Sequence, residues 1–219
     1  MNQIPHLNIY ILSLEQVKGN FYNNILVSSI SGESVNVHLI ESDSKWINNT
    51  IIGGSGREIT KGFIVQGSIL PVIINNIITK RGDIEGIAFH LINNADRLFP
   101  LLANNISGWE MMLKVSEIST NPSIKPISIN VKTLDDLNEY DSVLSGGFFD
   151  INISEEFGKT FLPSAWNDYH LAPTSMCIDN GIDVSTPKFN GPKTDFEGNS
   201  RPSLKSGAPI YDIGAYEHY

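Results

Sequence analysis

The hydrophobic and polar positions in the first half of the chain repeat at a nearly constant interval. Four segments each carry an asparagine pair followed by apolar residues: FYNNILVSS (21–29), WINNTIIGG (46–54), IINNIITKR (73–81) and LANNISGWE (102–110). Their second asparagines, 25, 27 and 29 positions apart, are Asn24, Asn49, Asn76 and Asn105. An interval of this size predicts a solenoid, in which each repeat forms one rung of a stack.

Strand-like segments repeat between the asparagine pairs as well. They are VNVHLIES (35–42), FIVQGSIL (63–70) and IAFHLINN (87–94), and IYILSLEQ (9–16) matches them more weakly. Aligned at their first residues, they superimpose Val35, Phe63 and Ile87, and Val35, Val37 and Leu39 are expected to face inward. A strand-only repeat of this length has no room for a crossover helix, so it predicts a parallel coil of about four rungs over residues 1–118.

The repeated asparagines have a structural interpretation. One rung cannot bury its own apolar face, so rungs stack with their strands about 4.8 Å apart. Asparagine tolerates a left-handed bend between strands, and identical amides on successive rungs can form a ladder of hydrogen bonds. We therefore interpret Asn24, Asn49, Asn76 and Asn105 as a structural ladder rather than as ligand contacts.

The second half of the chain departs from the repeat. TLDDLNEYDSVLSGG (133–147) has the apolar spacing and capping residues of a short amphipathic helix, expected over 133–145. We divide the single domain into β-helix rungs (1–118), an irregular insertion with this helix (119–165) and a closing segment packed on the rungs (166–219).

Composition and charge narrow the function classes. A net charge of −9 and a pI near 4.9 argue against a nucleic acid or an anionic membrane surface as partner. The single cysteine excludes an internal disulfide, and no uninterrupted apolar run is long enough to span a bilayer.

The first rung begins within ten residues of Met1, so we expect an open N-terminal end that pairs with another copy or with an upstream domain.

Three segments near the C-terminus carry a family resemblance. NDYHLAPTSMCIDNG (167–181), TDFEGNSRP (194–202) and YDIGAYE (211–217) closely resemble the closing segment of bacterial right-handed β-helix proteins of the pectate-lyase-like, "choice-of-anchor Q" type. The resemblance implies an all-β fold, a right-handed parallel β-helix solenoid with an irregular C-terminal segment and one short helix. It also implies a location outside the cell or on its surface, although the chain shows no signal peptide. It does not by itself imply an activity.

The closing motif is rich in charged residues that we interpret as turn and salt-bridge residues. They are Asp168, Asp179, Asp195, Arg201, Asp212 and Glu217. His170 is interpreted as a packing and hydrogen-bonding residue. The run Asp195, Glu197, Asn199 lacks the glycine and glutamate positions of a calcium loop, so no metal site is predicted.

One candidate binding site follows from the second set of strands. His38, Gln66 and His90 align on three successive rungs, on the face opposite to Val37 and Phe89. Histidine and glutamine both donate and accept hydrogen bonds, so such a ladder suits sugar hydroxyls. The alternative is a solvated face without a ligand.

A second candidate is basic. Arg57, Lys61, Lys80 and Arg81 follow corresponding strands and are expected to cluster at one edge. A lyase acting on acidic polysaccharide needs a lysine or arginine base, and often calcium held on carboxylates. No carboxylate pair occupies one column of adjacent rungs, so solvated turn residues are the alternative.

The sequence thus favours a secreted or surface module that binds a glycan or a protein, or is structural. The alternative is a polysaccharide lyase or glycoside hydrolase acting on acidic polysaccharide. No cofactor is expected, and calcium only if the chain is a lyase. The expected partners are a polysaccharide or a cell-surface component, with no nucleic acid and no membrane span.

Overall fold

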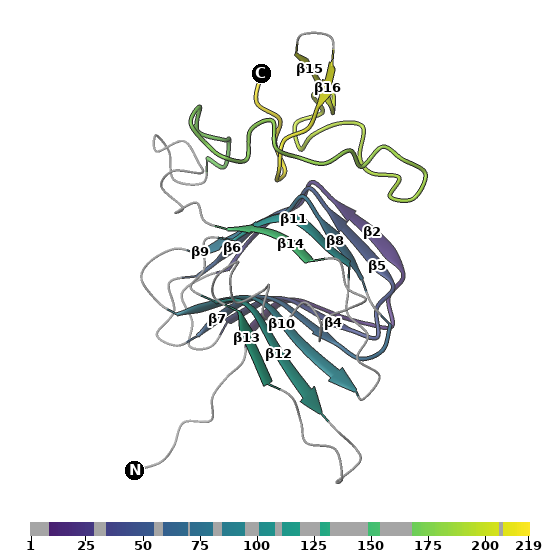
Figure 1. Cartoon of the computed structure of the whole chain (residues 1–219), viewed down its shortest axis with the longest axis vertical. Helices are drawn as coiled ribbons and strands as arrows, with labels where there is room; N and C mark the ends of the chain where they lie inside the picture. The colour runs from purple at the N-terminus through teal and green to yellow at the C-terminus, as the bar shows by residue number, and fades with distance from the viewer. Residues whose placement is uncertain are drawn as a thin grey trace.

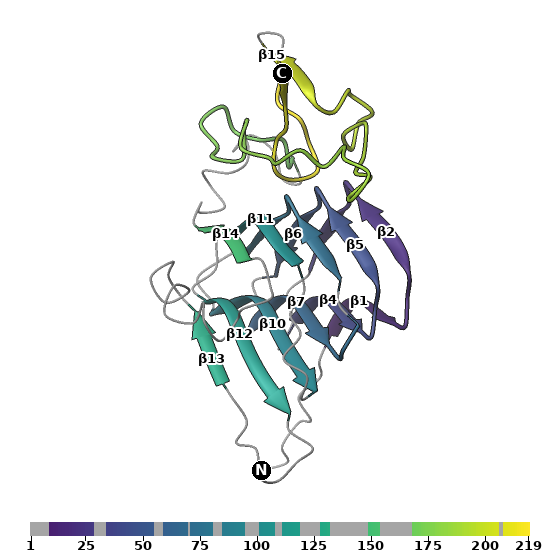
Figure 2. The same ribbon diagram turned by 45° about the vertical axis from the view of Figure 1, so that its right-hand side comes forward.

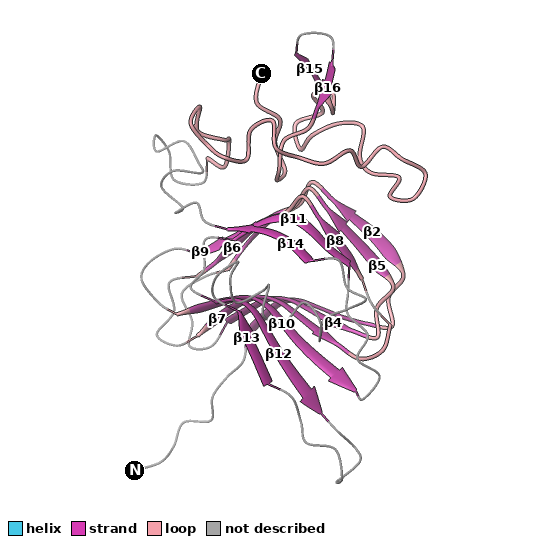
Figure 3. Cartoon of the chain, in the orientation of Figure 1, coloured by secondary structure: helices cyan, strands magenta, loops and turns pink. Residues whose placement is uncertain are grey.

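The computed structural model describes residues 9–28, 34–54, 59–69, 71–80, 85–94, 101–107, 111–118, 128–131, 149–153, 168–205 and 208–219. These residues form strands, turns and loops, and no helix occurs among them (Figure 3). Nearly all strand pairs are parallel. The predicted all-β class with parallel strands is confirmed for this part of the chain.

Two large sheets face each other (Figure 1). The lower sheet has six strands, in the order β1 (Ile9–Glu15), β4 (Ser34–Ile40), β7 (Thr60–Gln66), β10 (Gly86–Asn94), β12 (Met111–Ile118) and β13 (Ser128–Val131). The upper sheet has eight, in the order β2 (Gly19–Tyr22), β5 (Ser44–Ile47), β8 (Val72–Ile74), β11 (Leu101–Ser107), β9 (Ile77–Lys80), β6 (Thr50–Gly53) and β3 (Ile25–Val27), with β14 (Phe149–Ile153) beside β11. A small antiparallel pair, β15 (Ser203–Lys205) and β16 (Ala208–Ile210), lies near the C-terminus.

The chain alternates between the two sheets at a regular interval. Each pass adds one strand to the lower sheet and one or two to the upper sheet, in parallel with the strands of the previous pass. In the upper sheet the paired residues are separated by the same intervals as the asparagine pairs; Trp46, for example, lies opposite Ile73. The last strand of the lower sheet, β13, runs antiparallel to β12.

The core fills the space between the sheets. Its largest fully buried side chains include Trp46, Phe63 and Phe89. Phe21 stacks on Trp46 with ring centroids 4.2 Å apart, and Phe63 stacks on Phe89 at 5.7 Å. Burial of each such side chain contributes about 2–3 kcal/mol, which makes this interior the main source of stability.

The two asparagines of each pair have different roles. The first, Asn23, Asn48 or Asn75, has a positive φ between 53° and 58° and makes the left-handed bend. The second forms a ladder: the backbone N–H and Nδ2 of Asn24 both donate to Oδ1 of Asn49, at 2.9 and 2.8 Å. Asn49 donates in the same way to Oδ1 of Asn76, at 2.9 Å for both bonds.

The fourth predicted member of the ladder differs in its backbone. Asn105 lies inside the continuous strand β11, which pairs with β8 before the asparagines and with β9 after them. The bend between two strands is therefore absent at this level. The side chain of Asn105 lies outside the described residues.

The register of the lower sheet corrects the sequence alignment. Phe63 pairs with Val37 rather than with Val35, and Val35 pairs with Lys61. A shift of two residues keeps every side chain on the same face, so alternation alone could not detect it. The observed register places Phe63 on Phe89 and brings Ser34 Oγ within 2.7 Å of Thr60 Oγ1 in the interior.

The alternation of inward and outward side chains is irregular near the start of β4 and β7. Val37 and Leu39 belong to the core between the sheets, as expected. Val35 is buried but lies outside this cluster. Gly62, one residue before Phe63, faces the interior too, because a Cβ added there would meet the side chain of Ile78 at 2.6 Å.

The segment from residue 168 onward covers the outer surface of the upper sheet (Figures 1 and 2). Ile52 and Ile77 of the sheet pack against Leu171, Ile213 and further apolar residues of this segment. The helix expected over 133–145 lies outside the described residues, as does most of 119–165. The three-part division of the chain stays a prediction.

Candidate functional site

The outer face of the lower sheet carries the candidate site, which we call the histidine face: Tyr10, His38, Gln66, His90 and Ser116. His38 lies on β4, and its ring stacks on Tyr10 of β1 with centroids 5.1 Å apart and an interplanar angle of 18°. The side chain of Gln66 on β7 forms a hydrogen bond with His38. Three successive strands therefore contribute to one cluster of aromatic and amide groups.

The predicted ladder of His38, Gln66 and His90 needs a correction. The residue between the two histidines is Ile64, which pairs with His38 on one side and His90 on the other. Gln66 pairs instead with Ile40 and Ile92. The error has the same cause as the register shift above, since β7 is displaced by two residues.

The histidines nevertheless contact polar residues in a regular diagonal pattern. His38 bonds Gln66, which lies two residues beyond its direct partner on the next strand. His90 does the same, because its Nε2 lies 3.0 Å from Oγ of Ser116 and its direct partner is Lys114. The face is thus a set of diagonal pairs rather than a straight column.

The electrostatics of His38 favour the neutral ring. Burial lowers its pKa, the hydrogen bond to Gln66 acts in the opposite direction, and the positive charge of Lys61 lowers the pKa further. The Nε2 atom of His38 is buried and has no hydrogen-bond partner among the described residues. A buried nitrogen without a partner costs about 1–3 kcal/mol, and protonation of the ring would add a second buried donor, which agrees with the lowered pKa.

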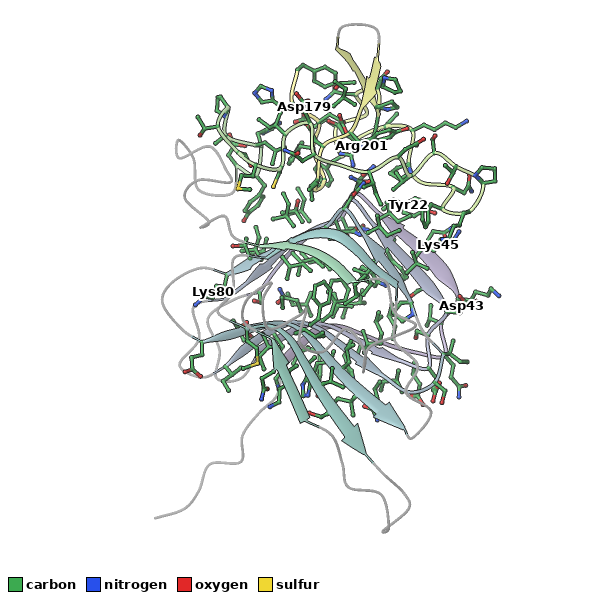
Figure 4. The ribbon with its side chains drawn as sticks, viewed as in Figure 1. Tyr22, Asp43, Lys45, Lys80, Asp179 and Arg201 are labelled. Carbon is green, nitrogen blue, oxygen red and sulfur yellow. The ribbon has the colours of Figure 1, made fainter. Side chains whose placement is uncertain are left out.

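The predicted basic cluster is only partly visible. Lys61 lies on β7 in the lower sheet, where its positive charge lowers the pKa of His38. Lys80 is the last residue of β9 in the upper sheet, pairs with Gly53 and is buried (Figure 4). Arg57 and Arg81 lie outside the described residues, so a cluster of all four stays a prediction.

His170 forms a second group of polar contacts, in the segment that covers the upper sheet. Its Nδ1 lies 2.6 Å from Oδ1 of Asp168, its Nε2 lies 3.3 Å from Oε1 of Glu197, and its ring stacks on Tyr216. Burial acts to lower the pKa of His170, but the two carboxylates outweigh it and the pKa is raised. The raised pKa favours the protonated ring, whose two N–H groups both face carboxylates, so His170 is poorly suited to be a general base.

A pocket of about 280 Å³ opens beside His170, and Glu217, His218 and Tyr219 also line it. The buried side chain of Glu217 also forms an ion pair, with Nε of Arg201 2.9 Å from its Oε1. Burial raises the pKa of Glu217 to about 7, the charge of Arg201 lowers it, and Asp212 raises it. Both guanidinium NH₂ groups of Arg201 donate to the carbonyl of Gly214 at 3.0 Å.

The remaining charged residues of the closing motif cap its turns. Oδ1 of Asp212 accepts from the backbone N–H of Asp179 at 2.7 Å, and Oδ1 of Asp195 accepts from the N–H groups of Glu197 and Asn199. Figure 4 shows Arg201 and Asp179 within this network. These contacts hold the turns together, which is the structural role that the sequence indicated for these side chains.

Sequence reasoning missed Tyr10 and Ser116 as members of the histidine face. Tyr10 belongs to the strand that matched the repeat only weakly, and Ser116 follows the last aligned strand. Trp46 is fully buried in the core, so it is not available to stack on a ligand. The signal that could have found Tyr10 is its place one repeat before Val35, with which it pairs.

No group of three or more His, Cys, Asp or Glu side chains that would hold a metal ion occurs in the part of the chain that the structure describes. The described residues also include no helix long and apolar enough to cross a membrane. Comparison with protein-family models, with curated proteins and with solved structures found no match to this chain.

Proposed function

We propose that this chain is the C-terminal part of a secreted or surface right-handed parallel β-helix protein, and that its histidine face binds a glycan. The fold proposal is supported by the parallel pairing of β1, β4, β7 and β10 at intervals close to one repeat. It is also supported by the closing motif, whose resemblance to pectate-lyase-like proteins was noted above. A surface location follows from the same resemblance.

One observation carries the glycan proposal: the ring of His38 stacks on the ring of Tyr10 and lies beside the side-chain amide of Gln66. Tyr10 is 39% exposed, so part of its ring is available to the C–H face of a sugar. The neutral imidazole and the Gln66 amide both donate and accept hydrogen bonds, as sugar hydroxyls do. An apolar surface beside a few fixed polar groups is typical of small-molecule sites.

A glycan array followed by calorimetry tests this function. We expect the wild-type chain to bind at least one class of glycan, and His38→Ala and Tyr10→Ala each to weaken binding about tenfold or more, the loss of roughly 1.4 kcal/mol. Tyr219→Ala is the matched control, because it removes an exposed aromatic side chain from the closing segment. Equal binding by all three variants would exclude the histidine face.

A polysaccharide lyase is the second candidate, and Lys61 favours it. Its charge acts on His38, so a cation that could neutralise a uronate lies beside the proposed sugar-binding groups. Incubation with uronate polymers, with and without added calcium, and measurement of the ultraviolet absorbance of the unsaturated product separate the two candidates. Turnover that Lys61→Ala abolishes would establish the lyase, whereas glycan binding without turnover supports the binding module.

A further inference from the structure

The N-terminal side of the stack ends in three edge strands. Among the described residues, β1 pairs only with β4, β2 only with β5, and β3 only with β6. Half of the backbone N–H and C=O groups of an edge strand point away from its only neighbour. At the other side of the stack, the antiparallel strand β13 follows β12 and β14 pairs with β11.

The apolar interior is incompletely covered at the same edge. Leu12, Leu14, Phe21 and Leu26 pack on the core but stay partly exposed. Their counterparts one rung further in, including Val37, Leu39 and Ile51, are fully buried. Phe21 stacks on Trp46 with one face of its ring, so its opposite face points toward the edge. The exposed surface at this edge is therefore apolar, as the core is.

The asparagine ladder gives the edge a direction. In each step, an asparagine uses both its backbone N–H and its Nδ2 to donate to Oδ1 of the asparagine on the following rung. Asn24 already uses these donors on Asn49. Its Oδ1 is therefore the acceptor at the start of the ladder, and it suits a preceding asparagine in a parallel strand.

The chain also defines the sequence that fits such a place. A large apolar residue stands three positions before the second asparagine, as Phe21, Trp46 and Ile73 do. Another stands two positions after it, as Leu26, Ile51 and Ile78 do. With Φ for a large apolar residue, the pattern of one rung is Φ-x-Asn-Asn-x-Φ.

We propose that the edge formed by β1, β2 and β3 binds an extended peptide segment of the pattern Φ-x-Asn-Asn-x-Φ as an additional parallel rung. The second asparagine of this segment donates its backbone N–H and its Nδ2 to Oδ1 of Asn24. The first apolar residue stacks on Phe21, and the second covers Leu26. Binding of this kind is β-augmentation with a side-chain ladder that fixes register and direction.

A fluorescent peptide that copies residues 44–53 (SKWINNTIIG) tests the proposal on the full chain by fluorescence anisotropy. We expect saturable binding, and a loss of about tenfold or more for the peptide with Asn49→Asp. That change replaces an N–H donor by an anion facing the Asn24 oxygen, and a loss of 1.4 kcal/mol corresponds to tenfold. All substitutions are in the peptide, so the fold of the protein is not disturbed.

Two further measurements determine where the peptide binds and in which direction it runs. A photoreactive phenylalanine at the Trp46 position of the peptide should cross-link to β2, and a peptide of reversed sequence should not bind. Absence of binding, equal binding of the Asn49→Asp peptide, or cross-links confined to β13 or β14 would overturn the proposal. A dimer in sedimentation that excludes the peptide would overturn it too, since the edge would then hold a second copy.

Discussion

The side-chain amide of Asn48 donates a hydrogen bond of 2.9 Å to the backbone carbonyl of Asp212, which follows 164 residues later in the chain. Two equivalent asparagines do the same. Asn23 donates to the carbonyl of Thr194 at 2.6 Å, and Asn75 donates to the carbonyl of Ile182 at 2.9 Å. In these three pairs the first asparagine therefore bonds to the closing segment, while the second asparagines form the ladder.

Substitution of Asn48 should separate its two roles. Asn48→Gly keeps the left-handed bend at φ 58° but loses the bond to Asp212, and we expect a destabilisation of about 1 kcal/mol. Asn48→Ala adds about 1–2 kcal/mol of backbone strain. Urea unfolding of both variants measures the difference, and equal stabilities would contradict a role for asparagine in the bend.

Among the ladder asparagines, substitution of Asn49 at the centre should reduce the stability of the fold most. Asn49→Leu removes the acceptor of two Asn24 bonds and the Nδ2 donor to Asn76, so we expect a loss of about 2–4 kcal/mol. Asn24→Leu is the matched control at the half-buried end of the ladder and should cost less. Thermal unfolding compares them; the reverse order would show that the ladder is not the source of the effect.

Gly214 should be intolerant of a side chain. It has φ +98°, and a Cβ there would overlap with the side chain of Ile77 in the upper sheet. We expect Gly214→Ala to destabilise the closing segment by about 2–4 kcal/mol through strain and overpacking. Gly198→Ala is the control, because Gly198 has φ +89° but no atom near its added Cβ, so only the strain should remain. Hydrogen exchange of the closing segment reports both.

The stability of the closing segment should rise as the pH falls from 8 to 5. The pKa of Glu217 in the folded chain, about 7, lies above its ordinary value of 4.5. The folded state therefore binds more protons between these values, and the stabilisation is lost as the pH rises through 7. The raised pKa of His170 acts in the same direction. The expected gain from Glu217 is about 3 kcal/mol.

Glu217→Gln provides the check on this pH dependence. The amide does not titrate, so urea unfolding of the variant at pH 5 and pH 8 should differ much less than that of the wild-type chain. An unchanged pH dependence in this variant would assign the effect to other groups. The same measurement on His170→Gln then gives the part of the pH dependence that His170 contributes.

The sequence predicted an all-β chain with parallel strands because the same interval occurs twice, in the asparagine pairs and in the strand-like segments. It could not predict the register of β7, since a shift by two residues leaves Phe63 and Val65 on the same face. Nor could it assign the left-handed bend to the first asparagine, because both members of a pair tolerate positive φ. Tyr10 and Ser116 joined the histidine face only through contacts between strands, which no local pattern specifies.

The closing segment contacts the asparagines in an order that differs from its own sequence. Asn23, Asn48 and Asn75 hold Thr194, Asp212 and Ile182, so the segment crosses the rungs rather than following them. It cannot dock progressively from one end, and its three anchoring points exist only after three rungs have stacked in the correct register. We therefore expect attachment of the C-terminus to be a late folding event. It requires the strands that carry Asn23, Asn48 and Asn75 to be paired in the correct register, so a chain with shifted strands could not form all three bonds.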